Sequence, residues 1–204
     1  MAALKLRFCD EVDGGFGWIV EEFMERCSHA LVEDGRVWVI DPVDGEGVED
    51  RIRAAGTPAG VLQLLDRHNR DCAALADRLG VRHHVVPQGS LGPFACIPVK
   101  QSRSWNEVAL WWPGRGVLVC ADVLGTAPYF LAGAERLAVH PLLRLRPPRR
   151  QLGALEPGMI FCGHGEGVIE DVGGALREAL STSRRRIPGQ LASALRAWRA
   201  SRPS

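Results

Sequence analysis

Residues 60–80 read GVLQLLDRHNRDCAALADRLG, and this stretch decides the fold class. Its apolar start is typical of a buried strand, and the charged run DRHNRD ends that strand. Residues 72–79 have the apolar spacing of a helix, with Asp71 in front as an N-cap and Gly80 behind as a stop. VRHHVV (81–86) then reads as a second strand, so the stretch predicts a strand–helix–strand unit.

Further strands and helices are predicted on both sides of this stretch, and one pair of strands forms a hairpin. Pro113-Gly114-Arg115 separates two apolar runs, which is a strong hairpin signal. The sequence predicts strands at 37–40, 60–65, 81–86, 107–112, 116–122 and 159–163, and helices at 46–55, 72–79, 171–182 and 188–200. Strand–helix units mixed with hairpins predict an α/β or α+β sandwich.

Length and charge favour an ordinary globular protein. The 204 residues suit a single domain over 1–204, with a basic helix at about 188–200. Lys plus Arg number 25 against 24 Asp plus Glu, so nucleic acid is not expected as a partner. No apolar run reaches the roughly 18–20 residues of a membrane span, and residues 1–10 lack the pattern of a secretory signal. We therefore expect a cytoplasmic protein without a membrane partner.

The six cysteines show no local motif. They stand at positions 9, 27, 72, 96, 120 and 162, with no C-x-x-C pair. This spacing excludes a four-cysteine zinc module and makes a disulfide framework improbable. Cys96, Cys120 and Cys162 lie in apolar, strand-like runs and are expected to be buried as small apolar groups, whereas Cys72 opens a predicted helix.

Polar residues follow three of the predicted strands. They are the run from Arg67 to Cys72, Asp122 after GVLVCA and His164 after MIFCG. Sites of α/β proteins gather at strand ends, where loops project side chains into a common cleft. We therefore expect Arg67, Asp71, Asp122 and His164 to lie together.

In order and spacing these residues resemble the metallo-β-lactamase superfamily. Residues 67–72 stand where that family has H-x-H-x-D-H, Asp122 where it has a strand-end Asp, and His164 in CGHGEG where it has a late G-H-G. Asp41 in VWVIDP matches an early strand-end Asp of the family. The resemblance extends over residues 28–182 and implies a four-layer α/β/β/α sandwich of two mixed sheets.

The departures from the family pattern concern its two-metal site. One half of that site uses three imidazoles, and those positions read Arg67, Asn69 and, in a loop of ambiguous alignment, Arg103. Arginine offers no lone pair to a metal, so we expect no dinuclear centre. The positions that remain for a single zinc ion are Asp71, Cys72, Asp122 and His164. Cys72 at a helix N-terminus is expected to have a lowered pKa.

A metal-free arrangement is the favoured interpretation, with a single zinc ion as the alternative. Two guanidinium groups supply the charge of the missing ion, so we expect Arg67, and also Arg103, to pair with Asp122 or Asp71. Strand alternation predicts that His68 points away from the cleft. His140, which precedes a proline, could line the mouth of the cleft.

Three functions follow from these alternatives. The first is a degenerate, catalytically silent protein that binds an anionic small molecule through Arg67, Asn69 and Arg103. The second is a mononuclear zinc hydrolase that uses the four ligands named above. The third is a structural or assembly protein that forms a homodimer through its apolar surface.

Overall fold

Two mixed β-sheets lie face to face in this computed structural model, which describes residues 4–200. The first sheet has six strands in the order β1-β2-β3-β4-β5-β6. Its strands are β1 (Leu6–Val12), β2 (Gly15–Val20), β3 (Cys27–Glu33), β4 (Arg36–Ile40), β5 (Thr57–Gln63) and β6 (His83–Val85). The first four are antiparallel, whereas β4, β5 and β6 run parallel because helices connect them.

The second sheet has five strands in the order β13-β10-β9-β8-β7. Its strands are β7 (Gly89–Leu91), β8 (Phe94–Ser102), β9 (Trp105–Trp112), β10 (Val117–Cys120) and β13 (Met159–Cys162). Only β10 and β13 pair in parallel. A two-stranded ribbon of β11 (Leu124–Gly125) and β12 (Ala138–Val139) leads away from the end of β10.

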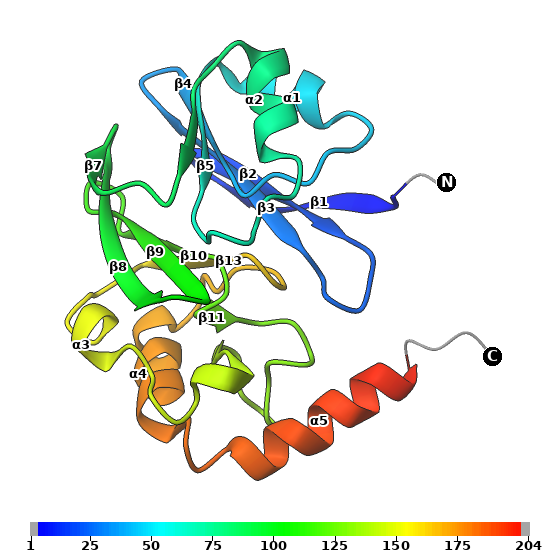
Figure 1. Ribbon diagram of the computed structural model, residues 1–204, viewed down its shortest axis with the longest axis vertical. Helices are drawn as coiled ribbons and strands as arrows, with labels where there is room; N and C mark the ends of the chain where they lie inside the picture. The colour runs from blue at the N-terminus through cyan, green and yellow to red at the C-terminus, as the bar shows by residue number, and fades with distance from the viewer. Residues whose placement is uncertain (1–3, 201–204) are drawn as a thin grey trace.

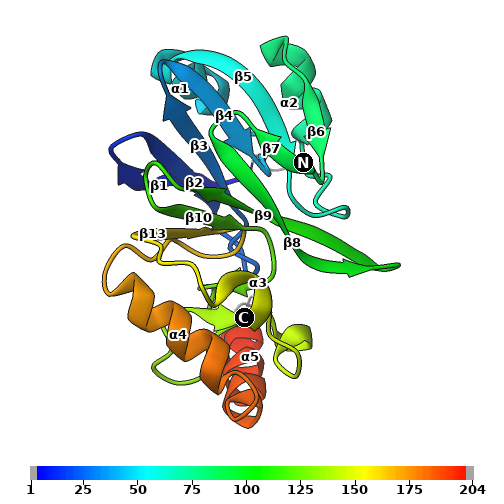
Figure 2. The ribbon, with the colours of Figure 1, turned by 90° about the vertical axis from the view of Figure 1, so that its left-hand side faces the viewer.

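Helices cover the outer faces of the two sheets. They are α1 (Val48–Ala55), α2 (Cys72–Leu79), α3 (Arg149–Leu152) and α4 (Val172–Thr182). Helix α5 (Ile187–Ala200) instead lies against the loop that carries Tyr129, and a 3-10 turn spans Pro141–Leu143. Figure 1 shows α1 and α2 beside the first sheet and α3 and α4 beside the second, and the turned view of Figure 2 shows the same order of layers. The predicted four-layer α/β/β/α sandwich is confirmed.

Strand alternation lets β4 contribute to two separate cores. In β4, Val37 and Val39 pack with Ile52 of α1 and Leu75 of α2 between the first sheet and its helices. Trp38 and Ile40, on the other face of β4, contribute to the larger core between the sheets. Because a β4 side chain faces one core or the other, both layers of apolar packing depend on the same five-residue strand.

The predicted elements agree best where turn residues mark their ends. Helix α2 has the predicted bounds, and Gly80 closes it in the left-handed conformation with φ of 69°. Asp71 stands at the N-cap position, but its side chain bonds to no N–H of the helix. Strand β5 begins and ends earlier than predicted. Among the described residues, no helix is both long and apolar enough to cross a membrane.

Candidate metal centre

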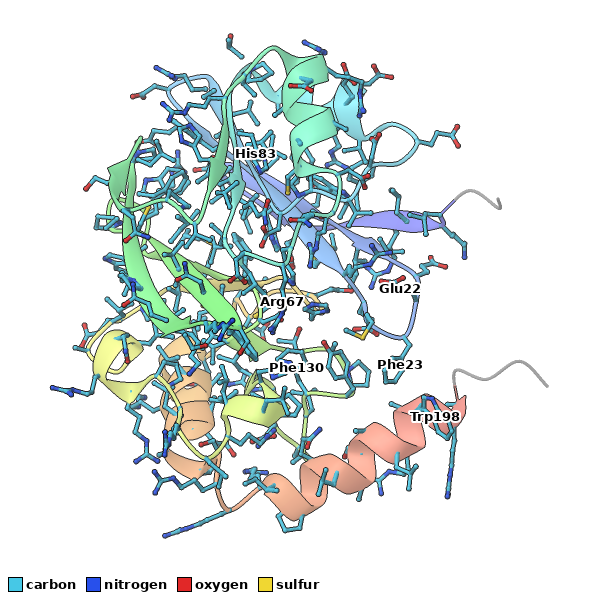
Figure 3. The ribbon with its side chains drawn as sticks, in the orientation of Figure 1. Glu22, Phe23, Arg67, His83, Phe130 and Trp198 are labelled. Atoms are coloured by element: carbon cyan, nitrogen blue, oxygen red, sulfur yellow. The ribbon has the colours of Figure 1, made fainter. Side chains whose placement is uncertain are left out.

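Four strand ends bring the candidate residues together. Asp41 follows β4, Arg67 and His68 follow β5, Asp122 follows β10 and His164 follows β13. Since β4 is parallel to β5 and β10 to β13, the carboxyl ends of each pair meet at one edge of their sheet. Figure 3 shows Arg67 at this edge, between the two sheets.

Three buried side chains form the centre of the group. The Nε2 atom of His68 lies 2.9 Å from Oδ1 of Asp122, and the Nε2 atom of His164 lies 3.1 Å from the same oxygen. The three atoms all lie within 4.8 Å of one another, as the ligands of one metal ion do. Asp122 and His164 were predicted to converge, and they do.

The prediction that His68 points away from the site was wrong. Strand β5 ends at Gln63, and the backbone N–H of His68 donates to the carbonyl of Leu65 at 2.9 Å. The chain therefore turns before His68, and strand alternation no longer sets the direction of its side chain. His68 thus occupies the site from a position between two motif residues.

The outer nitrogens of both imidazoles are held by oxygen acceptors. Nδ1 of His68 lies 3.2 Å from Oδ2 of Asp41, and Nδ1 of His164 lies 2.7 Å from the carbonyl oxygen of Met24. An oxygen acceptor requires the hydrogen on Nδ1, so the Nε2 atom of each neutral ring carries a lone pair. Both Nε2 atoms face the carboxylate of Asp122, and an oxygen acceptor behind each Nδ1 atom is typical of metal-ligating histidines.

This convergence leaves a buried oxygen without a hydrogen bond. Oδ1 of Asp122 has no partner of acceptable geometry among the described residues, although both imidazoles are close. Burial opposes its ionisation, but His164 and His68 hold the pKa of Asp122 well below its usual range. The pKa of His68 is raised overall. Burial and the charge of Arg70 act to lower it, but the hydrogen bonds to Asp122 and Asp41 have the larger combined effect. Asp122 is therefore ionised beside the two imidazoles.

Glu107 of β9 fixes the loop that carries Asp122. One of its carboxylate oxygens accepts the backbone N–H groups of Asp122 and Val123, each at 2.9 Å. Its other oxygen accepts the indole N–H of Trp105 at 2.8 Å. Burial, with a contribution from Asp122, raises the pKa of Glu107 to about 7. These bonds set the position of Asp122 from the neighbouring strand.

Arg67 lies on the outer side of the three buried groups. Its guanidinium contacts Oδ2 of Asp122 at 3.3 Å, which confirms the predicted pairing. It also stacks 4.0 Å from the ring centroid of Trp105 and donates to the carbonyl of Ser104 at 3.2 Å. The Arg67 side chain is 44% exposed, and its contacts with Trp105 and Ser104 hold the plane of the guanidinium. The charged group is therefore accessible to an anion from solvent.

The other predicted zinc ligands have different partners. Oδ2 of Asp71 accepts the N–H of Asp44 at 2.8 Å, and the thiol of Cys72 donates to the carbonyl of His68 at 3.5 Å. Burial and the charge of Asp41 raise the pKa of Cys72, so the expected lowering of that pKa was wrong. Neither side chain belongs to the group of ligand atoms around Asp122.

Two predicted anion-binding residues lie at the edge of the site. The amide oxygen of Asn69 accepts from the side chain of Gln63 at 3.2 Å. Arg103 is exposed in the turn between β8 and β9 and has no ion pair with any described residue. The structure therefore brings Arg67, but not Arg103, into contact with the carboxylate.

Arg70 was not singled out from the sequence, yet it joins three strand ends. Its guanidinium donates to the carbonyls of Cys27 and Asp41, each at 2.7 Å, and of Gly163 at 2.8 Å. Its backbone has φ of 38°, an unfavourable conformation for a side chain of this size. Arg70 thus ties the first sheet to the segment before His164.

Aromatic rings surround His164 on the side of the ribbon. Phe130 stacks on its ring at 5.9 Å between centroids, and Tyr129 meets it edge-on at the same distance. His140 packs against Phe130 and Trp105, with ring centroids 5.2 and 4.8 Å away. Burial lowers the pKa of His140 to about 4, so this ring is neutral beside the site.

Comparisons with known proteins agree with this architecture. No protein-family profile and no curated protein matches the chain. Solved structures with a similar fold include a fragment of diflavin flavoprotein A 5 from Nostoc sp. PCC 7120, with 12% identity over 95% of this chain and 100% of that one and a TM-score of 0.60. DIM-1 metallo-β-lactamase has 13% identity over 98% of this chain and 100% of its own, with a TM-score of 0.56. The chemotaxis sensor ODP from T. denticola has 15% identity over 89% of this chain and 98% of its own, with a TM-score of 0.54. The chain therefore has the metallo-β-lactamase fold.

Proposed function

We propose that this protein is a mononuclear metal-dependent hydrolase of anionic substrates. The ligands of its single divalent ion would be His68, Asp122 and His164. The observation that carries the proposal is the convergence of three buried ligand atoms on one point, where the Asp122 oxygen lacks a hydrogen bond among the described residues. A buried polar group without a partner is costly, and a metal ion supplies the missing partner.

The donor set fits zinc or a similar ion. Two imidazoles and one carboxylate are common ligands of catalytic metals, and three protein ligands leave positions open for other molecules. Asp41 and the Met24 carbonyl orient the imidazoles from behind, at 3.2 and 2.7 Å. When bound, such an ion supplies Lewis-acid chemistry toward a carbonyl or phosphoryl oxygen.

The loss of the family's other ligands supports one ion rather than two. Arg67 and Asn69 stand where two imidazoles of the first metal half would be, and neither replaces them. Among the fold neighbours, DIM-1 is a metallo-β-lactamase and the chemotaxis sensor ODP forms a peroxy diiron species. A metal-dependent function is therefore consistent with the fold, with a smaller metal centre.

Arg67 gives the proposal its substrate class. Its guanidinium is partly exposed, and the face of Trp105 limits its motion at 4.0 Å. A planar guanidinium suits bidentate recognition of a carboxylate or a phosphate. Arg67 would hold the anionic group of a substrate next to Asp122, whose other oxygen faces the imidazoles.

A metal-free anion-binding protein is the second candidate. The observation that favours it is the contact of Arg67 with Asp122 at 3.3 Å, because this guanidinium already offsets the carboxylate charge. The two candidates differ in the role of His164. A metal ligand is required for zinc uptake, whereas a buried structural imidazole is not.

Zinc uptake by metal-free protein tests the proposal. Wild type is compared with His164→Asn and with His84→Asn, a matched control on β6. We expect His164→Asn to bind one zinc equivalent less than wild type and His84→Asn to bind as much. Hydrolysis of bis(p-nitrophenyl) phosphate should depend on zinc and be lost in His164→Asn. Equal zinc uptake by all three proteins, with phosphate bound by the metal-free form, would favour the second candidate.

A further inference from the structure

We infer that the amino-terminal hairpins hold a separate, structural zinc ion on two thiolates, one imidazole and one carboxylate. The ligands are Cys9, Asp10, Cys27 and His29. Cys9 and Asp10 lie on β1, and Cys27 and His29 lie on β3, with β2 between these strands. This inference does not depend on the proposed function, because none of these side chains belongs to the group around Asp122.

Five of the six distances between the ligand atoms are close to the edges of a tetrahedral zinc site; Cys9, Asp10 and Cys27 form the compact group, and His29 adjoins it through Asp10 and Cys27. Sγ of Cys9 lies 3.7 Å from Sγ of Cys27, and the latter lies 3.6 Å from Nε2 of His29. Oδ2 of Asp10 lies 3.1 Å from that Nε2 atom and 3.8 and 3.9 Å from the two sulfurs. A tetrahedron with usual zinc bond lengths has edges of about 3.8 Å for S–S, 3.6 Å for S–N and 3.4 Å for N–O.

Gly17 of β2 leaves the space that this site needs. In the first sheet Gly17 pairs with Cys9 on one side and with His29 on the other. A Cβ atom at Gly17 would lie 3.0 Å from the His29 ring and 3.2 Å from both Asp10 Oδ2 and Cys9 Sγ. Any larger residue would therefore crowd the ligand atoms, whereas glycine lets side chains of two non-adjacent strands meet above it.

A β-bulge turns Asp10 toward the same side as Cys9. Neighbouring residues of a regular strand face opposite sides, so Cys9 and Asp10 would normally point apart. The pairing of β1 with β2 shifts register between Cys9 and Val12, and Asp10 has φ of 51°. Bulges re-aim side chains, so Cys9 and Asp10 can both face the same side of the sheet.

The site is closed to solvent, which favours a structural role. Cys9, Cys27 and His29 are buried, and only 5% of the Asp10 side chain is exposed. Four protein ligands complete the tetrahedral coordination of zinc, so no position remains for a substrate. Binding would release the two thiol protons to solvent and stabilise the folded chain.

Three of these four residues contact the segment that carries His164. Oδ1 of Asp10 accepts the N–H of Gly167 at 2.8 Å, and the N–H of Cys27 donates to Gly163 at 2.9 Å. The ring of His29 stacks on Phe161 of β13 at 4.9 Å. Zinc at this site would therefore fix the two sheets relative to one another on both sides of residue 164.

Cobalt titration of the metal-free full chain tests the inference, because only thiolate ligands give charge-transfer absorption with Co²⁺ in the near ultraviolet. We expect this absorption to saturate at one equivalent in wild type and to be lost in Cys27→Ser. The matched control Cys96→Ser, a buried cysteine outside the site, should retain it. His164→Asn should also retain it, so this result is independent of the metal centre at Asp122.

X-ray absorption at the zinc edge is measured on wild-type protein, so this second test does not depend on whether a variant folds. We expect sulfur neighbours at about 2.3 Å together with nitrogen or oxygen neighbours. Zinc surrounded only by nitrogen and oxygen would overturn the inference, as would a cobalt spectrum without the thiolate band in wild type. Persistence of the band in Cys27→Ser would also overturn it.

Discussion

One carboxylate oxygen of Asp41 lies 3.2 Å from Nδ1 of His68, and the other accepts the backbone N–H of Leu64 at 2.9 Å. Asp41 thereby links the end of β4 to the turn after β5 and sets which nitrogen of His68 faces Asp122. Such a carboxylate–imidazole pair is the usual outer support of a metal-ligating histidine.

Replacing Asp41 with Asn should therefore weaken metal binding more than it weakens the fold. We expect Asp41→Asn to lower zinc affinity by about 10- to 100-fold, because the amide no longer fixes the tautomer of His68. Asn tolerates the left-handed backbone of Asp41, which has φ of 43°. Asp34→Asn is the matched control, since Asp34 has φ of 50° in an exposed turn. Equal zinc affinities, measured against a competing chelator, would show that Asp41 does not support the site.

Arg67 is expected to contribute to anion binding and little to stability. Its side chain is 44% exposed, and exposed ion pairs contribute about 0–1 kcal/mol. Arg67→Ala should keep the free energy of unfolding within about 1 kcal/mol of wild type and lose most of the affinity for inorganic phosphate. Arg82→Ala, at another exposed arginine, should change neither quantity. A loss of several kcal/mol in Arg67→Ala would instead assign Arg67 a structural role.

Arg70 is expected to contribute to the stability of the fold and not to anion binding. Its guanidinium donates to three backbone carbonyls, and a lysine ammonium cannot span all of them in the same plane. We expect Arg70→Lys to reduce the free energy of unfolding by about 2–3 kcal/mol. Urea denaturation measures this, with Arg78→Lys as a control because 41% of the Arg78 side chain is exposed and its ion pairs with Asp44 and Glu49 lie at the surface. An unchanged midpoint in Arg70→Lys would refute the joining role of Arg70.

His140 should make the fold sensitive to acid. Burial lowers its pKa to about 4 in the fold, so its contribution is fully present above pH 6.5. The contribution decreases as the pH falls from 6.5 towards 4, and the total loss amounts to about 3 kcal/mol at most. Asn can keep the acceptor that His140 offers to the N–H of Leu142. His140→Asn should therefore lose less stability than wild type over this range in parallel denaturation series, and identical pH profiles would contradict the assignment.

The fold could be predicted from the sequence where local signals act alone. Helix α2 and its stop at Gly80 follow from spacing and from a residue that tolerates positive φ. The first three strands were not predicted individually, and the exposure of β1 residues alternates with little apolar contrast. Their pairing depends on contacts across the sheet, which no short stretch of sequence specifies.

The candidate site shows a similar limit. Asp122 and His164 could be placed because each directly follows an apolar strand. His68 could not, since a turn after Gln63 changes the direction of its side chain. Cys9 and Cys27 were not recognised as possible ligands because their partners come from different strands, without local motif spacing. Side chains that meet only through the tertiary fold leave no periodic signal in the sequence.

The most direct measurement is a crystal structure of the zinc-loaded protein with anomalous scattering recorded at the zinc edge. Apart from the zinc inferred at Cys9 and Cys27, the account predicts one anomalous peak at the end of β10, at about 2.0–2.2 Å from Nε2 of His68, Oδ1 of Asp122 and Nε2 of His164. No peak at this position, two peaks a few ångströms apart, or zinc bound through Asp71 and Cys72 would contradict it.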